Sequence, residues 1–334
     1  MPASVTFVSL STGWVLGYAP CEYTTCLALL KTVNAGRTWV SVPPPPTLFE
    51  GAEINDPASV TKIRFADTSD GWAYAPGLWA THDGGDHWHQ ISLPSRSSPG
   101  IINDVEAARG MVSAALRDYD GFTRVETSAT TIDSWHESPL VMMGGAGPVP
   151  QATIVLSQGG GWIVQVDRTV LDGARLVRTG WSAWRPPCET GGGGLYLAAA
   201  TATSLAAVCT DGQWANFPTR VVVSFSSNAG ATFSTARRQP TMEIAGGAAS
   251  PRPGDVVIWT VDARGNVALV ATFNGGASWV NVFGTTTEQG VTDLGFTSAS
   301  QGVAVLSNDA GTSGEVLMTF DAGHRWAPMP FRQA

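Results

Sequence analysis

The stretch Thr81-His82-Asp83-Gly84-Gly85-Asp86-His87-Trp88 recurs along the chain, and its recurrence decides the fold. The shared pattern is Ser/Thr-x-Asp/Asn-x-Gly, with an aromatic residue three positions after the glycine. Four further complete copies occupy residues 32–39, 226–233, 272–279 and 319–326. Two partial copies keep the aromatic residue and end in Asp133-Ser134-Trp135 and Ser182-Ala183-Trp184. The chain therefore contains seven related units.

These units follow one another at a nearly constant period. Their aromatic residues are Trp39, Trp88, Trp135, Trp184, Phe233, Trp279 and Trp326. Neighbouring positions in this series are 46–49 residues apart. A period of about 40–50 residues with four short strands per unit is typical of a β-propeller. The sequence therefore predicts an all-β fold, a seven-bladed β-propeller of four-stranded antiparallel blades, with residues 1–334 as a single domain.

A second repeated element helps to place the blade boundaries. It predicts an inner strand, a tight turn that needs glycine, and a second strand that begins with a large apolar residue. It occurs at residues 7–14, 65–72 and 296–303. The two elements together place the blades at about residues 4–43, 58–92, 100–139, 150–186, 194–237, 245–283 and 291–331. Because the chain starts on an inner strand and ends after an outer one, we expect no strand to be exchanged between the first and last blades.

The composition supports a large core and limits the class of partner. Apolar residues make up 43% of the chain and charged residues 14%, and 38 glycines and 21 prolines suit many tight turns. The net charge of −8 argues against nucleic acid, which needs a basic binding surface. No apolar run approaches the roughly 18 residues that indicate a membrane span. We expect the partner to be a protein or a glycan.

The four cysteines form two local pairs. Cys21 and Cys26 lie five positions apart, and Cys188 and Cys209 flank one strand and its return. Such pairs indicate two disulfides and an oxidising compartment, and neither spacing fits the Cys-x-x-Cys pairs of a zinc site. Free buried thiols are the alternative. We expect an extracytoplasmic protein, secreted or at the cell surface, whose targeting segment is not part of this sequence.

The repeated motif has a structural interpretation. Its Asp or Asn accepts backbone N–H groups within a turn, its glycine supplies a positive φ, and its aromatic ring packs beneath the hairpin. The residues expected to act in this way are Asn34, Trp39, Asp83, Trp88, Asn228, Phe233, Asn274, Trp279, Asp321 and Trp326.

The partial copies lack the residues that make this turn. Thr130 and Ile132 stand at the Asp/Asn and glycine positions of the third unit, and Thr179 and Trp181 stand there in the fourth. We expect these to be the least regular turns of their face, with the aromatic residue at the end of each still packed.

The motif resembles the Asp-box, and the chain is similar to the Asp-box (BNR) repeat propellers. Residues 7–14 and 65–72 read Phe-x-Ser/Asp-x-x-x-Gly-Trp, and residues 81–88 read Thr-x-Asp-Gly-Gly-x-x-Trp. This combination resembles a secreted bacterial branch related to photosystem II assembly factors. The resemblance covers nearly the whole chain and implies the fold. It leaves the function open, because sialidases, xyloglucanases, sortilin-type receptors and assembly factors share the box.

Binding is expected on the face opposite the Asp-boxes, where loops from different blades converge around the channel. The candidate binding residues are Arg117, Asp118, Tyr119 and Asp120 in one loop, and Glu53 and Asp56 in the connection that follows Pro43. Carboxylates, a phenol and guanidinium groups suit a sugar site. A polar turn between two strands is the alternative interpretation.

Three of the five histidines lie close together in and after the second Asp-box. His82, His87 and His89 occur with Asp83 and Asp86, and such residues at short spacing can bind a metal. Asp83, however, is expected to be used by the turn itself. We therefore expect no metal and no cofactor.

The proteins that this chain resembles include enzymes, but the sequence features of those enzymes are absent from the chain. Sialidases resemble six-bladed propellers with an early Arg-Ile-Pro, which does not occur in this chain. Xyloglucanase-type enzymes pair two propellers, and this chain has repeats for one. No GxSxG, HExxH or P-loop occurs, so the catalytic residues are unknown. We expect a non-catalytic binding or scaffold protein; the alternatives are a glycan-active enzyme, as a glycoside hydrolase or sialidase-like protein, and a carbohydrate-binding lectin.

Overall fold

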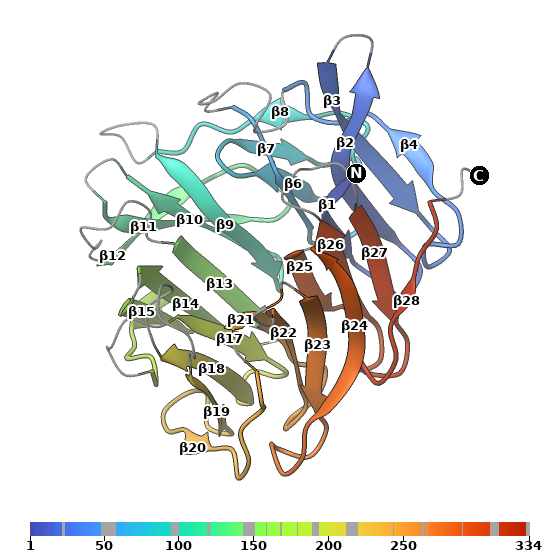
Figure 1. Ribbon diagram of the computed structural model, residues 1–334. Helices are drawn as coiled ribbons and strands as arrows, with labels where there is room; N and C mark the ends of the chain where they lie inside the picture. The colour runs from blue at the N-terminus through green and yellow to red at the C-terminus, as the bar shows by residue number, and fades with distance from the viewer. Residues whose placement is uncertain are drawn as a thin grey trace.

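A computed structural model shows a ring of β-sheets (Figure 1). The structure describes residues 1–21, 24–47, 58–94, 100–118, 121–142, 151–157, 159–167, 169–178, 180–188, 194–211, 220–242, 244–261, 264, 266–288, 290–307 and 314–331. These residues form 28 β-strands and no helix. Accordingly, no described helix offers the length and apolar character that crossing a membrane would require.

The strands form seven sheets, which we number as blades 1 to 7. Blade 1 contains β1 (Pro2–Phe7), β2 (Gly13–Cys21), β3 (Thr24–Thr32) and β4 (Val40–Val42). Blade 2 contains β5 (Lys62–Phe65), β6 (Gly71–Tyr74), β7 (Leu78–Thr81) and β8 (His89–Gln90). Blade 3 contains β9 (Ile101–Ala108), β10 (Met111–Arg117), β11 (Thr123–Ala129) and β12 (His136–Met142). Blade 4 contains β13 (Gln151–Ser157), β14 (Gly160–Asp167), β15 (Thr169–Val177) and β16 (Gly180–Ala183).

The remaining three blades repeat this plan. Blade 5 contains β17 (Leu195–Ala199), β18 (Leu205–Asp211), β19 (Arg220–Ser226) and β20 (Ser234–Thr235). Blade 6 contains β21 (Ile244–Ala249), β22 (Val256–Val261), β23 (Asn266–Thr272) and β24 (Val280–Glu288). Blade 7 contains β25 (Gly290–Phe296), β26 (Gly302–Ser307), β27 (Gly314–Thr319) and β28 (Ala327–Pro328).

Every blade is an antiparallel sheet of four strands that follow one another in the sequence. The predicted seven-bladed propeller is therefore confirmed, and no strand is exchanged between the first and last blades. The first strand of each blade contacts the first strand of the next, and β25 contacts β1. These contacts close the ring, with the first blade (blue) beside the last (red) in Figure 1. The first strands therefore surround the central channel.

The described residues form seven hydrophobic core clusters, one in each interface between neighbouring blades. Between blades 1 and 2, Trp14 is fully buried and stacks on Phe65 with their ring centroids 3.8 Å apart. The indole of Trp14 also donates a hydrogen bond to the carbonyl of Gly84, at 3.0 Å. Each blade therefore folds against both of its neighbours, and the aromatic residue that opens the second strand is a core residue.

The turns between third and fourth strands share one hydrogen-bond pattern in the five complete repeats. In blade 1, Oδ1 of Asn34 accepts the N–H of Thr38 at 2.9 Å, and the hydroxyl of Thr32 accepts the N–H of Gly36 at 3.0 Å. Ala35 and Gly36 both have positive φ, at 59° and 77°. The corresponding bonds in the other four blades are accepted by Asp83, Asn228, Asn274 and Asp321. We call these the box turns.

The box turns lie beside the turns between first and second strands. The N–H of Ala35 donates to the carbonyl of Ser11 at 2.9 Å, and equivalent bonds occur in blades 2, 5, 6 and 7. Both sets of turns therefore share one face of the propeller, which we call the box face. Each first strand runs toward this face.

The two partial repeats form different turns. In blade 3, Oγ of Ser128 donates to the carbonyl of Ile132, and no Asp or Asn occupies the position that organises a box turn. In blade 4, Val177 pairs with Gly180, which leaves room for only a short connection. Trp135 and Trp184 are nevertheless packed against the cores of the adjacent interfaces.

Both predicted disulfides are present. Cys21–Cys26 joins the adjacent ends of β2 and β3. Cys188–Cys209 ties the segment that follows blade 4 to β18 of blade 5. The second bond therefore fastens a connection between two blades.

Candidate functional site

The central channel contains a cavity of about 330 Å³, which lies within the usual size range of ligand sites. Its lining comes from the first strands of all seven blades, with a few residues beyond them. Phe7 and Phe296, the last residues of β1 and β25, belong to the lining. The cavity therefore reaches the end of the channel that adjoins the box face.

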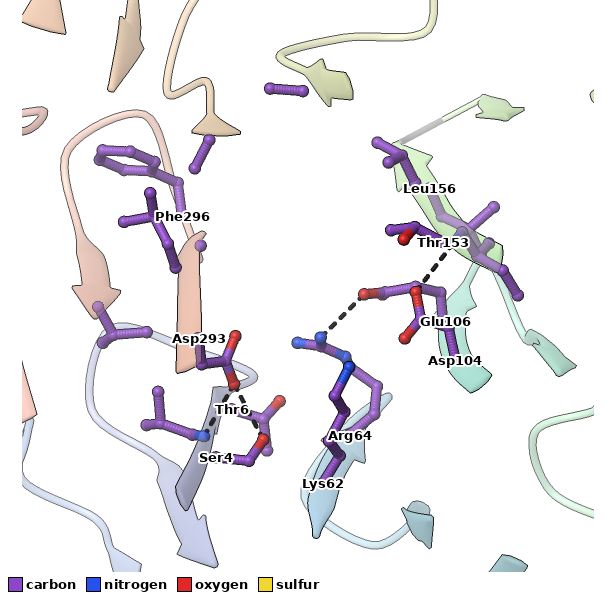
Figure 2. A pocket seen from close by; sticks show the side chains of 18 of the residues that line it. Ser4, Thr6, Lys62, Arg64, Asp104, Glu106, Thr153, Leu156, Asp293 and Phe296 are labelled. Carbon is purple, nitrogen blue, oxygen red and sulfur yellow. Dashed lines mark hydrogen bonds and ion pairs between the residues drawn. The ribbon is translucent and has the colours of Figure 1, made fainter. Parts of the chain in front are cut away.

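Five charged side chains from three blades lie in this cavity (Figure 2). The members are Lys62 and Arg64 from β5, Asp104 and Glu106 from β9, and Asp293 from β25. In each pair the two residues are separated by one position, so their side chains leave the strand on the same side. We call these five residues the channel cluster.

An ion pair crosses the interface between blades 2 and 3. A guanidinium nitrogen of Arg64 lies 2.9 Å from Oε1 of Glu106, and about a quarter of each side chain is exposed. The pKa of Glu106 is raised to about 7, chiefly by burial. The nearby carboxylates of Asp104 and Asp293 also raise it, and Arg64 offsets these effects only in part. Burial alone would lower the pKa of Arg64, but Glu106 and other acidic neighbours raise it by a larger amount. The net pKa of Arg64 is therefore raised, and the guanidinium stays charged.

Asp104 uses both carboxylate oxygens to join three blades. Its Oδ1 accepts the phenol of Tyr74 from blade 2 at 3.1 Å and the N–H of Val105 at 3.0 Å. Its Oδ2 accepts the N–H of Ile154 from blade 4 at 2.8 Å. The exposed fraction of Asp104 is only 8%. These bonds satisfy polar groups of the inner edge strands, so Asp104 has a structural role.

Asp293 makes the equivalent connection where the ring closes. Its Oδ2 accepts the hydroxyl of Ser4 at 2.9 Å and the N–H of Val5 at 3.0 Å, both from blade 1. The hydroxyl of Ser4 in turn accepts the N–H of Ile63 in blade 2, at 3.2 Å. Neither of these bonds to Asp293 uses Oδ1, and Figure 2 shows the carboxylate directed into the cavity.

Lys62 differs from the other members of the channel cluster. Its side chain is exposed and extends beside that of Arg64 (Figure 2). Among the described residues, the ion pairs involve Arg64, Arg124 and three histidines, and none involves Lys62. The ammonium group of Lys62 is therefore the cation of the cavity that is open to an incoming acceptor.

The two described candidates of the sequence analysis, Arg117 and Asp118, are not part of the cavity lining. Oδ1 of Asp118 accepts the N–H of Phe122 at 2.8 Å and its Oδ2 pairs with Arg124 at 3.0 Å, so this carboxylate organises the turn between β10 and β11. Arg117 is the last residue of β10. Four of the candidates, Glu53, Asp56, Tyr119 and Asp120, lie outside the described residues.

Sequence reasoning missed the channel cluster. The available signal was the alternation Lys62-Ile63-Arg64 and Asp104-Val105-Glu106 on strands that are expected to be inner and mostly apolar. Alternation places charges on one side of a strand, but it does not show which blades face one another across the channel.

The fold and the cavity define a seven-bladed β-propeller with a charged central channel. No protein-family profile and no curated protein sequence matches the chain. Similar solved structures include YCF48 bound to a D1 peptide, with a TM-score of 0.59 and 18% identity over 96% of this chain and 93% of that chain. YCF48 from Cyanidioschyzon merolae gives a TM-score of 0.61 and 14% identity over 96% and 95% of the two chains.

A glycoside hydrolase structure is also similar in fold. The GH74 enzyme of Niastella koreensis gives a TM-score of 0.52 and 12% identity, and the match covers 99% of this chain and 72% of the enzyme. At these identities each likeness shows the fold.

Proposed function

We propose that this protein is a non-catalytic, extracytoplasmic binding protein that takes a carboxylate-bearing peptide segment into its central channel. The observation that carries the proposal is the open ammonium of Lys62 beside the guanidinium of Arg64 in a cavity of ligand size. A carboxylate between two such donors would form charge-assisted hydrogen bonds, which are stronger than neutral ones. The two disulfides support an extracytoplasmic location.

The other groups of the cavity suit a peptide. The hydroxyl of Thr153 and the carboxylate of Asp293 belong to residues of the lining, whereas the hydroxyls of Thr6 and Thr292 are already bonded to backbone groups of Phe65 and Ala3. Hydroxyls and carboxylates are acceptors for the N–H groups of a peptide backbone, and the hydroxyls are also donors to its carbonyls. A structure of YCF48, a propeller of similar fold, contains a bound D1 peptide, which supports a peptide as the ligand class.

Most of the carboxylates in the cavity are already engaged in holding the blades together. Asp104 accepts three hydrogen bonds and Glu106 is paired with Arg64. A hydrolytic site needs one carboxyl free to donate a proton and a second free to act as a base or nucleophile. This arrangement favours binding over chemistry.

Substitution of Lys62 by methionine is expected to weaken peptide binding about 10–100-fold. A hydrogen bond to a charged group contributes about 1.5–3 kcal/mol, and each 1.4 kcal/mol changes a dissociation constant tenfold. The measurement uses an array of short peptides of varied sequence, each present with a free and with an amidated C-terminus. The strongest binder is then titrated against the wild type and Lys62→Met.

The chain supplies a matched control, because Lys31 is its only other lysine. Lys31 lies 5.1 Å from the ring centroid of Trp14, in the interface between blades 1 and 2. Lys31→Met changes the net charge by the same amount and is expected to leave the affinity within about twofold. Equal losses in the two variants, or an array on which no peptide is retained, would contradict the proposal.

One observation favours glycoside hydrolysis as a second candidate. The raised pKa of Glu106 is typical of a general acid, and Asp293 lies on the opposite side of the cavity in Figure 2. Chromogenic glycosides and sialosides test this function directly. Turnover that disappears in both Glu106→Gln and Asp293→Asn would replace the binding proposal by a hydrolase. A channel that only binds gives no turnover in any of the three proteins.

A further inference from the structure

A second cluster of chemically active side chains lies on the box face, away from the channel. His82 of the blade 2 box turn, His89 of β8 and Asp133 of the turn between β11 and β12 come together across the interface of blades 2 and 3. One possible ligand atom from each residue lies within 4.8 Å of those of the other two. Both histidines direct Nε2 at the same oxygen, Oδ2 of Asp133, at distances of 3.0 Å and 2.6 Å.

The orientation of His82 is fixed by a fourth residue. Nδ1 of His82 lies 2.7 Å from Oδ1 of Asp70, a carboxylate that is only 5% exposed. Because a carboxylate accepts hydrogen bonds, Nδ1 donates to Asp70, and Nε2 then faces Asp133 either with a second proton or with a lone pair that a cation can share. A histidine held in this way by a carboxylate, with its other nitrogen free to coordinate, is the usual arrangement around a protein-bound metal.

Nε2 of His82 and Oδ2 of Asp133 face each other across the interface of blades 2 and 3, at 3.0 Å. A lone pair on Nε2 of His82 facing the carboxylate of Asp133 is repulsive unless a proton or a cation lies between them. Both imidazole nitrogens face one carboxylate oxygen, so the cluster attracts positive charge.

We propose that His82, His89 and Asp133 bind a divalent transition-metal ion that links blades 2 and 3. Two imidazole nitrogens and one carboxylate oxygen are three ligands that zinc accepts, with a fourth position left for water. The same set also suits nickel, cobalt and copper, whereas magnesium and calcium prefer oxygen ligands. The three side chains are 31%, 52% and 20% exposed, so an ion can reach them from solution.

This inference revises the expectation of no metal that the sequence suggested. The histidine-rich stretch was visible, but the ligand that completes the set, Asp133, follows His89 by 44 residues and belongs to another blade. Asp83 accepts the N–H of His87 within its turn, and the imidazole of His87 pairs with it at 2.7 Å while remaining 89% exposed. His87 is therefore not part of the cluster, although it lies in the same box turn.

The test is a calorimetric titration of the untagged, chelator-treated protein with zinc chloride. We expect saturable binding of one ion per chain. His89→Ala and Asp133→Ala should abolish binding at micromolar zinc, and Asp70→Asn should weaken it about 10–100-fold through the orientation of His82. Cobalt(II) added in place of zinc should give the visible absorption bands of a site with imidazole nitrogen ligands.

The control is His87→Ala, which removes an imidazole from the same turn without removing a ligand. It should bind zinc as the wild type does. Urea midpoints of all variants without metal show whether each remains folded. Zinc should raise the midpoint in the wild type and His87→Ala, less in Asp70→Asn, and not in His89→Ala or Asp133→Ala. Absence of saturable binding in the wild type, or equal losses in His87→Ala and His89→Ala, would overturn the proposal. Peptide binding by the channel uses different residues, so its failure would be separate from the failure of this site.

Discussion

Replacement of Asp104 by alanine is expected to lower the free energy of unfolding by about 3–5 kcal/mol. The carboxylate accepts hydrogen bonds from Tyr74, Val105 and Ile154, and alanine leaves these donors without their partner. Each buried donor that loses its partner costs about 1–3 kcal/mol. Burial raises the pKa of Tyr74 well above its ordinary value, so the phenol remains a donor throughout the usual range of measurement.

Urea unfolding followed by tryptophan fluorescence measures this loss. The matched control is Asp67→Ala, because Asp67 also accepts two backbone N–H groups, from Ser69 and Asp70, but is exposed. That variant should lose about 1 kcal/mol or less, since water replaces the lost acceptor. Tyr74→Phe combined with Asp104→Ala should cost less than the sum of the two single changes. Similar losses in Asp67→Ala and Asp104→Ala would contradict the role assigned to Asp104 between the blades.

Replacement of Trp14 by alanine is expected to cost about 3–5 kcal/mol, as large-to-small changes of buried aromatic residues do. Trp14 has no exposed surface, stacks on Phe65 and donates to the carbonyl of Gly84. Alanine therefore opens a cavity between blades 1 and 2 and removes a hydrogen bond that joins them. Trp14→Phe should recover part of the loss, because it restores the ring while the indole donor stays absent.

Trp88 provides the comparison for this second prediction. It packs at the edge of the same interface, with its ring centroid 6.2 Å from that of Phe65 and its indole donating to the carbonyl of Pro43. Trp88 is only partly buried, so Trp88→Ala should lose clearly less than Trp14→Ala. Thermal unfolding gives both values. A larger loss at Trp88 would contradict the assignment of Trp14 to the core of the interface and of Trp88 to its edge.

The fold could be predicted because its determinants are local and repeated. A residue such as Asn34 organises its own hairpin, and seven related units at one period specify the ring. The disulfide of Cys21 and Cys26 was equally visible, since the two residues lie at the adjacent ends of one hairpin.

The functional candidates could not be predicted, because they depend on contacts between blades. Arg64 meets Glu106, and His89 meets Asp133, across 42 and 44 positions of sequence. Which of these residues face one another is set by the closure of the ring and by the register of each first strand. The sequence analysis therefore favoured polar loops such as the one that begins at Asp118, where several charges are neighbours in the sequence. In the structure Asp118 organises a turn.

Acetylation of lysines in the presence of a bound peptide tests the channel as the ligand site most directly. The wild type, alone and saturated with the best binder of the array, is treated with an amine-reactive acetylating reagent, and the modification of Lys62 and Lys31 is compared by mass spectrometry. A peptide carboxylate held in the channel predicts that acetylation of Lys62 falls about tenfold or more while that of Lys31 is unchanged. Unchanged acetylation of Lys62 at saturation, or equal protection of both lysines, would contradict binding in the channel.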